Sequence, residues 1–272
     1  MIKNNKKIAI FFNSLRGLNV LKFLNKKFNV DVYLCKKNLN ISLKNKLKNN
    51  NYNLLSKINY KFIDKIKRKK YFLLISAGCP YIFPKDLINS SENGTINLHA
   101  GRLPQYKGGS PLNWQIINGE KTVGISVIKM TTSLDAGPIY EKFNFKIGKN
   151  DDIKYVHNIA NNMFPTMTLN AISKISKKIK PNKQSFNRSK VYKQRSDKDG
   201  LIIWNKLNSK EVYNFVRAIT KPYPGAYYYK LNKKVRLFKC KEVKLNPNLI
   251  PGTQFKIKNK KFIRCKNGSV QI

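Results

Sequence analysis

The chain contains only two histidines, and one of them stands where chemistry would be expected. His99 closes the apolar run Thr95–His99 two residues after Asn97, so in a strand both side chains point to the same side. An imidazole titrates near neutral pH and suits proton transfer, and an amide suits donation to a developing negative charge. Asp135, one of only 13 acidic residues, lies in a later loop rich in glycine and proline. These three residues are candidates for one acid–base site, although each taken singly also fits a turn-forming or satisfied polar role.

The other histidine and the cysteines carry weaker signals. His157 lies among lysine and asparagine residues in a helical segment, where a solvated or capping role is expected. The four cysteines include no Cys-x-x-Cys pair, which argues against a zinc site or a disulfide framework and favours buried thiols. No metal is therefore expected.

Alternating strand-like and helical segments must position the candidate residues. Continuous apolar runs predict strands buried on both faces, and apolar residues at helical spacing follow the first run and fill 151–179, with a bend expected at Pro165. This alternation predicts an open, mostly parallel α/β sheet, whose ligands lie beyond the carboxyl ends of the strands. The expected strands are 7–12, 30–35, 59–62, 71–76, 95–99, 123–130 and 139–145.

Several function classes are disfavoured by missing patterns. The turn after the first strand has a single glycine, so a dinucleotide fingerprint is absent, and no P-loop motif occurs. No apolar run is long enough to span a bilayer, and the basic start lacks a cleavable leader, so a cytoplasmic protein is expected.

The C-terminal part changes in character. Residues 181–193 are polar and are expected to form a structureless linker. A helix is expected at 213–219, followed by short apolar runs, punctuated by glycine and proline, that predict a β-rich module. These runs are 226–231, 234–245, 253–257 and 262–265.

The candidate residues belong to a longer pattern. Residues 95–114, with Asn118-Gly119-Glu120 and 134–139, resemble the folate-dependent formyltransferase family. That family shares an Asn-x-His, an L-P-x-[YW]-[RK]-G loop and an Asp in a D-x-G-P-[IL] loop. Here the Asn and the Asp are 38 positions apart, as in the family. Family members act on methionyl-tRNA, glycinamide ribonucleotide or the amino sugars of nucleotide sugars.

The C-terminal part resembles the second domain of the same family. The matching elements are R-x-x-x-D-G-x-I-x-W at 195–204, the Arg-Ala of 217–218, and P-[YW]-P-G-A at 222–226. The resemblance implies a Rossmann-like catalytic domain over 1–180, a linker over 181–193, and a small β-barrel domain of the OB-like kind over 194–272.

The resemblance also implies a mechanism and a set of site residues. Formyl transfer from N10-formyltetrahydrofolate to a primary amine makes the formyl oxygen negative, which Asn97 would stabilise, while His99 accepts a proton and Asp135 orients the imidazole. Relatives bind the pterin ring in the turn that here contains Gly78, Cys79, Pro80 and Tyr81. Residues expected near the acceptor are Arg102, Lys107, Gly108, Gly109 and Ser110.

The acceptor is the open question. The formal net charge of +42, from 55 Lys and Arg residues against 13 acids, would attract folate, a nucleotide diphosphate or RNA alike. The codon bias of an A/T-rich genome would also produce such a lysine-rich composition. Pro111–Trp114 resembles the nucleotide-sugar enzymes, and residues 35–40 lack the Pro/Arg/Gly-containing segment of methionyl-tRNA enzymes. An amino-sugar nucleotide is therefore preferred, initiator methionyl-tRNA is the alternative, and a non-catalytic basic RNA-binding relative is a third reading. A homodimer is possible.

Overall fold

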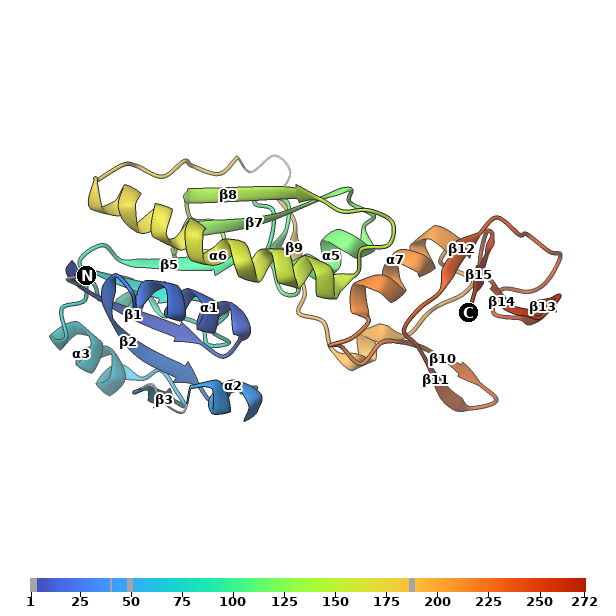
Figure 1. The fold of residues 1–272 in the computed structure, drawn as a ribbon, viewed down its shortest axis with the longest axis horizontal. Helices are drawn as coiled ribbons and strands as arrows, with labels where there is room; N and C mark the ends of the chain where they lie inside the picture. Colours follow the sequence, from blue (N-terminus) through green and yellow to red (C-terminus); the bar gives the residue numbers. More distant parts are fainter. Residues whose placement is uncertain (1–3, 40, 48–50, 186–188) are drawn as a thin grey trace. The chain divides into compact units, whose positions relative to one another are not determined.

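A seven-stranded sheet lies at the centre of the N-terminal half (Figure 1). The computed structural model describes residues 4–39, 41–47, 51–185 and 189–272. The sheet has the order β3-β2-β1-β4-β5-β7-β8. Its first five strands in this order pair in parallel and β7 pairs antiparallel to β5, so the expected mostly parallel α/β sheet is confirmed. The strands are β1 (Asn4–Phe12), β2 (Phe28–Cys35), β3 (Asn53–Leu55), β4 (Leu73–Ser76), β5 (Thr95–His99), β7 (Thr122–Lys129) and β8 (Ile139–Lys146).

Helices cover the two faces of this sheet according to the alternation of side chains along each strand. In β1, Ala9 and Phe11 join one buried cluster with Ile63 and Ile66 of α3. Phe12 points to the other face, where α1 packs so closely that a Cβ on Gly17 would lie 2.2 Å from the Phe12 side chain. The helices of this half are α1 (Leu15–Leu24), α2 (Ile41–Lys46), α3 (Tyr60–Arg68), α4 (Lys85–Ile88), α5 (Pro111–Ile117) and α6 (Ile153–Ser176).

The strand predicted at 59–62 is wrong, because these residues begin α3. The side chain of Asn59 accepts a hydrogen bond from the backbone N–H of Phe62 and caps the helix. Burial then follows helical spacing at Ile63 and Ile66.

The C-terminal half is rich in β-structure, as expected. It contains η1 (Asp197–Gly200), α7 (Ser209–Ile219), a hairpin and a four-stranded antiparallel sheet of order β12-β15-β14-β13. The run 234–245 contains two strands rather than one, and β15 was not predicted. The strands are β10 (Ala226–Lys230), β11 (Lys233–Leu237), β12 (Lys241–Val243), β13 (Gln254–Ile257), β14 (Lys260–Arg264) and β15 (Ser269–Gln271).

The expectation that 181–193 lacks structure is wrong at Asn182, Val191 and Tyr192. Asn182 forms an antiparallel bridge with Ile139, through N···O distances of 2.7 and 3.0 Å. Val191–Tyr192 forms the short strand β9 beside β6 (Lys107–Gly108). Residues 186–188 of the expected linker lie outside the described residues. Backbone pairing therefore organises both ends of a segment whose composition suggested none.

The chain forms two compact units that are interleaved in sequence. The first contains 1–107, 124–144 and 159–190, and the second contains 108–123, 145–158 and 191–272, so the chain crosses between them at five places. Within the second unit, Asn113 of α5 donates to the Ala218 carbonyl at 2.8 Å. The Arg195 guanidinium lies over the rings of Trp114 and Phe215, at 4.8 and 5.1 Å from their centroids. In the described ranges, no helix is both long and apolar enough to cross a bilayer.

Candidate active site

Strand β5 carries Asn97 and His99 to the carboxyl edge of the sheet. Asn97 is in register with Ser76 at the end of β4, and His99 with Ser126 of β7. Asp135 reaches the same place from the loop between β7 and β8. The Asn97 amide nitrogen lies 3.3 Å from one carboxylate oxygen of Asp135, and Nδ1 of His99 lies 3.4 Å from the other. The structure thus brings the three predicted residues together.

The loop that carries Asp135 is held by a residue that the sequence analysis missed. Asp135 has φ +47°, a left-handed conformation that Asp tolerates better than most residues. The buried side-chain amide of Gln184 donates to the carbonyls of Asp135 and Gly137, at 2.8 and 2.7 Å. Gln184 therefore ties both sides of the turn at Asp135 to the segment after α6.

The turn after β5 determines the tautomer of His99. Nε2 lies 2.6 Å from the backbone carbonyl of Tyr106, and a carbonyl only accepts, so Nε2 carries the hydrogen. This leaves Nδ1, which faces Asp135, as the atom that can gain or lose a proton. The contact requires Gly101, because a Cβ there would lie 2.4 Å from both His99 Nε2 and the Tyr106 oxygen.

Burial dominates the titration of His99. The ring is 5% exposed, and loss of hydration lowers the pKa of His99 below its ordinary value. Asp135 and the hydrogen bond to Tyr106 act in the opposite direction, and the positive charge of Arg16 adds to the lowering of the pKa. The net direction favours a neutral ring near pH 7, in which Nδ1 can accept a proton.

A cavity of about 480 Å³ opens beside these residues. Asn97 and Asp135 line it, whereas His99 does not. The rest of the lining comes from the loop that carries Asp135 and from the turn after β4, and much of it is apolar. Its other residues are Ser76, Cys79, Pro80, Tyr81, Ile82, Phe83, Ile128, Met130, Thr131, Thr132, Ser133 and Leu134.

Three of the four residues predicted to hold the pterin line this cavity: Cys79, Pro80 and Tyr81. Gly78 adopts φ +82°, which glycine allows without strain, and turns the chain after β4. The Cys79 sulfur lies 3.0 Å from that of Cys35 at the end of β2, and both thiols are free. Thiol contact between β2 and this turn was not anticipated from the spacing of the cysteines.

The residues predicted to contact the acceptor are spread along the segment after His99. Lys107 is buried, and the Arg102 guanidinium lies 5.8 Å from the Tyr106 ring centroid. Gly108, Gly109 and Ser110 belong to the second unit. There a Cβ on Gly108 would lie 2.2 Å from the Tyr192 oxygen, a Cβ on Gly109 would lie 2.4 Å from Gln194 Cα, and Ser110 Oγ accepts from the Arg195 N–H at 3.1 Å. The structure explains these glycines by close backbone packing, and contact with an acceptor stays a prediction.

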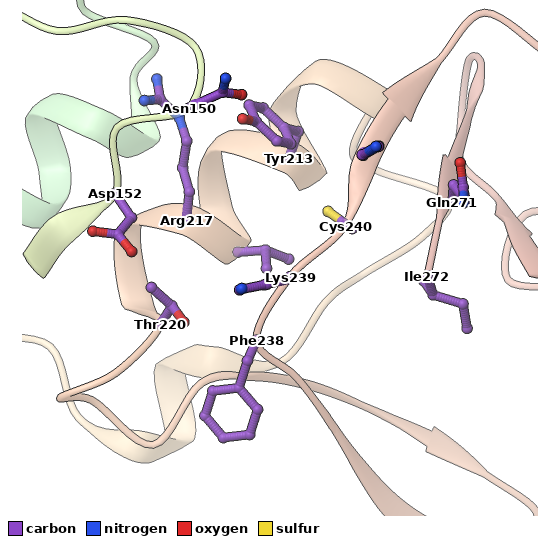
Figure 2. Close-up of a pocket in the computed structure, with 12 residues that line it drawn as sticks. Asn150, Asp152, Tyr213, Arg217, Thr220, Phe238, Lys239, Cys240, Gln271 and Ile272 are labelled. Atoms are coloured by element: carbon purple, nitrogen blue, oxygen red, sulfur yellow. The ribbon is translucent and has the colours of Figure 1, made fainter.

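Another cavity lies within the second unit, between α7, residues 238–241 at the connection from β11 to β12, and the end of β15 (Figure 2). Its volume is about 370 Å³, and its lining includes Arg217, Lys239 and Cys240 but none of the predicted site residues. His157 is also in this unit, where its Nε2 lies 2.9 Å from the Tyr223 hydroxyl, a structural contact. Among the described residues, no three His, Cys, Asp or Glu side chains are grouped to hold a metal ion.

Comparison with known proteins gives matches along most of the chain. The formyl transferase family matches residues 23–171, and the formyl transferase C-terminal domain matches 195–272. The bifunctional polymyxin resistance protein ArnA of Wigglesworthia glossinidia brevipalpis is 34% identical over 222 residues; the match covers 79% of this chain but only 32% of ArnA, about a third of its length. A methionyl-tRNA formyltransferase of Caldanaerobacter subterraneus subsp. tengcongensis is 30% identical over 217 residues, covering 79% of this chain and 70% of the relative.

Several solved structures align over almost the whole chain, some of them also over almost their own whole length. One of these is the N-formyltransferase of Helicobacter canadensis in complex with folinic acid and dTDP-3-aminofucose, with a TM-score of 0.76 and 18% identity. The alignment covers 98% of each chain, and at this identity it shows a shared fold.

Proposed function

The chain belongs to the formyl transferase family, and we propose that it transfers a formyl group from N10-formyltetrahydrofolate to the primary amine of a nucleotide-linked amino sugar. Family membership confirms the resemblance read from the sequence, and with it the fold class and the enzyme class. What we propose beyond family membership is the formyl donor, the amine acceptor and the role of each residue.

One observation carries the reaction type: Asn97, His99 and Asp135 converge beside a cavity at the carboxyl edge of the sheet. A hydrogen-bond donor, a proton acceptor and an orienting carboxylate are what acyl transfer to an amine requires.

The cavity beside them fits the aromatic part of a folate. Its volume of about 480 Å³ lies within the range of small-molecule sites, and Tyr81, Phe83 and Met130 provide apolar and aromatic surface for a flat ring. The turn of Gly78, Cys79, Pro80 and Tyr81 would hold the pterin. When bound, the folate would supply an electrophilic formyl carbon near Asn97.

In the proposed reaction, Asn97, His99 and Asp135 have separate roles. The Asn97 amide nitrogen carries two hydrogens; one is donated to Asp135 at 3.3 Å, and the other can donate to the formyl oxygen as it becomes negative. A donor of this kind stabilises the transition state by about 3 kcal/mol. As the amine nitrogen bonds to the formyl carbon, its proton would pass to Nδ1 of His99 through the Asp135 carboxylate, which lines the cavity. The bond between the formyl carbon and N10 would then break, and the proton would return to N10 of the departing tetrahydrofolate. The Nε2–Tyr106 hydrogen bond keeps the ring in the tautomer that leaves Nδ1 open.

The amino-sugar acceptor is supported by the likeness to the Helicobacter canadensis enzyme, whose complex contains dTDP-3-aminofucose and whose alignment covers 98% of both chains. Initiator methionyl-tRNA is a second candidate acceptor, favoured by 30% identity to a methionyl-tRNA formyltransferase.

An assay with alternative acceptors tests the proposal. The purified protein is given N10-formyltetrahydrofolate with dTDP- and UDP-linked amino sugars in one series and with methionyl-tRNA in another, and products are identified by mass. We expect formylated sugar nucleotide and loss of turnover in the His99→Ala variant. Turnover of methionyl-tRNA alone would overturn the amino-sugar acceptor, and an unimpaired His99→Ala variant would overturn the proposed chemistry.

A further inference from the structure

Arg16 reaches the active site from an element that the proposed mechanism does not use. It is the second residue of α1, yet its Nη1 donates to the carbonyl of Leu98 in β5 at 3.0 Å. Strand β4 lies between β1 and β5, so the side chain crosses the carboxyl end of β4 to make this bond. Gly78, in the turn after β4, lies beside this route: a Cβ there would be in ordinary contact with Arg16 Nη1, at 3.8 Å.

Two contacts fix the position of the Arg16 guanidinium, one with an aromatic ring and one with a backbone carbonyl. Its central carbon lies 4.8 Å from the centroid of the Phe164 ring in α6, a cation–π arrangement, while Nη1 bonds to Leu98. Leu98 is the residue between Asn97 and His99, so the bonded carbonyl belongs to the peptide that joins Leu98 to His99. A planar, always charged group in a fixed position beside that peptide is suited to orient it.

We propose that Arg16 is a positioning residue for the acid–base site, fixing the peptide before His99 and supplying the positive charge that opposes Asp135. The proposal rests on the proposed function, because it concerns the proton acceptor of that reaction. It assigns Arg16 an action through His99 and no contact with either substrate.

Two charged residues of opposite sign affect the protonation of the His99 imidazole. Asp135 faces Nδ1 from the β7–β8 loop and favours the protonated ring, whereas Arg16 disfavours it from α1. Within the described residues, Asp135 and Arg16 are the two charged groups that act on the ring. Uncharged groups also lie beside it, among them the Tyr106 carbonyl from the turn after β5 and Ser126, the register partner of His99, from β7. Without Arg16, burial alone would oppose Asp135 and the Tyr106 hydrogen bond, and the pKa of His99 would rise. A base that holds its proton to higher pH is available in a smaller fraction of molecules at neutral pH.

Two variants separate charge from packing. Arg16→Met and Arg16→Lys both keep an unbranched chain over Phe164, but only lysine keeps the positive charge. Because the chain has two histidines, NMR titration of the imidazole signals reports His99 directly and gives His157, in the other unit, as an internal reference. This readout requires neither the formyl donor nor the acceptor.

We expect the pKa of His99 to rise in Arg16→Met and to stay near the wild-type value in Arg16→Lys, with His157 unchanged in both. In turnover assays the acidic limb of the pH–rate profile should move to higher pH in Arg16→Met, and kcat should fall on the order of tenfold with little change in KM. An identical His99 titration in wild type and Arg16→Met would overturn the proposal. If the His99 signals behave as expected while every acceptor fails, the proposed function is wrong and the positioning role stands.

Discussion

Gly101 determines how closely the chain can turn back on His99. The Nε2–Tyr106 bond of 2.6 Å exists only because no side chain occupies the space between them. This glycine lies outside the left-handed region, so its role is close approach and not backbone freedom.

We therefore expect Gly101→Ala to displace the imidazole and reduce kcat by about tenfold to a hundredfold, since small misplacements of a catalytic group are costly. Gly148→Ala is the matched control, because a Cβ at Gly148 meets only Asp151 Oδ2 at an ordinary 3.5 Å. Steady-state kinetics and circular dichroism would check this, and equal activity of the two variants would contradict the role given to Gly101.

At the scale of elements, α1 compensates for a proline in α6. Pro165 has no N–H and cannot donate to the carbonyl of Asn161 four residues earlier. The side chain of Asn19 in α1 donates to that carbonyl instead, at 3.3 Å. The two helices are thus joined at the point where the ladder of α6 is interrupted.

A double-mutant cycle tests this compensation. Asn19→Ala should lower the free energy of unfolding by about 1 kcal/mol, the usual worth of one hydrogen bond. In a Pro165→Ala background, the new N–H can serve the Asn161 carbonyl, so the same change should cost less. Urea unfolding of the four proteins gives the coupling; the same loss in both backgrounds would show that Asn19 does not serve the freed carbonyl.

Elements with local signals were predictable from the sequence, and those set by distant partners were not. Buried parallel strands appear as continuous apolar runs, and the Asn97, His99 and Asp135 pattern was visible from spacing and flanks. The start of α3 was mistaken for a strand because its four residues alternate, and the helical burial follows only later.

Two residues near the site left no sequence pattern. Gln184 and Arg16 bind backbone carbonyls, and the residues bound lie 47 and 49 positions from Gln184 and 82 positions from Arg16. A carbonyl is present at every position, so a side chain that bonds to one gives no complementary residue type to search for. Such contacts require the topology of the sheet to be known first.

At the scale of the whole molecule, cations far outnumber acids, and two acids, Asp31 and Asp197, each pair with two cations. Asp31 lies 3.5 Å from Lys7 Nζ and 3.1 Å from Lys69 Nζ, and Asp197 contacts both Lys234 and Arg236. Burial raises the pKa of Asp31, but hydrogen bonds from Tyr71 and Lys69 outweigh it and hold the pKa below its usual range. With 55 Lys and Arg residues against 13 acids, a large excess of positive charge remains even where an acid is shared by two cations.

Salt should therefore stabilise the fold. Raising NaCl from about 0.02 to 0.3 M shortens the screening length from roughly 20 to 6 Å and weakens repulsion among the lysines. We expect Tm to increase by a few degrees in differential scanning calorimetry, with no such increase in a neutral osmolyte of equal osmolality. A Tm that falls with salt would mean that the shared ion pairs outweigh the repulsion.

The interleaving of the two compact units bears on how such a protein can diversify. A genetic crossover after residue 190 would bring in a new 191–272 but leave 108–123 and 145–158, which belong to the same unit, from the original parent. The Asn113–Ala218 hydrogen bond and the stacking of Arg195 on Trp114 join just these separately inherited pieces. Chimeras between distant relatives would thus carry mismatched halves of one core. We therefore expect the second unit to change by coordinated substitutions at separate places in the gene more readily than by replacement of its C-terminal segment.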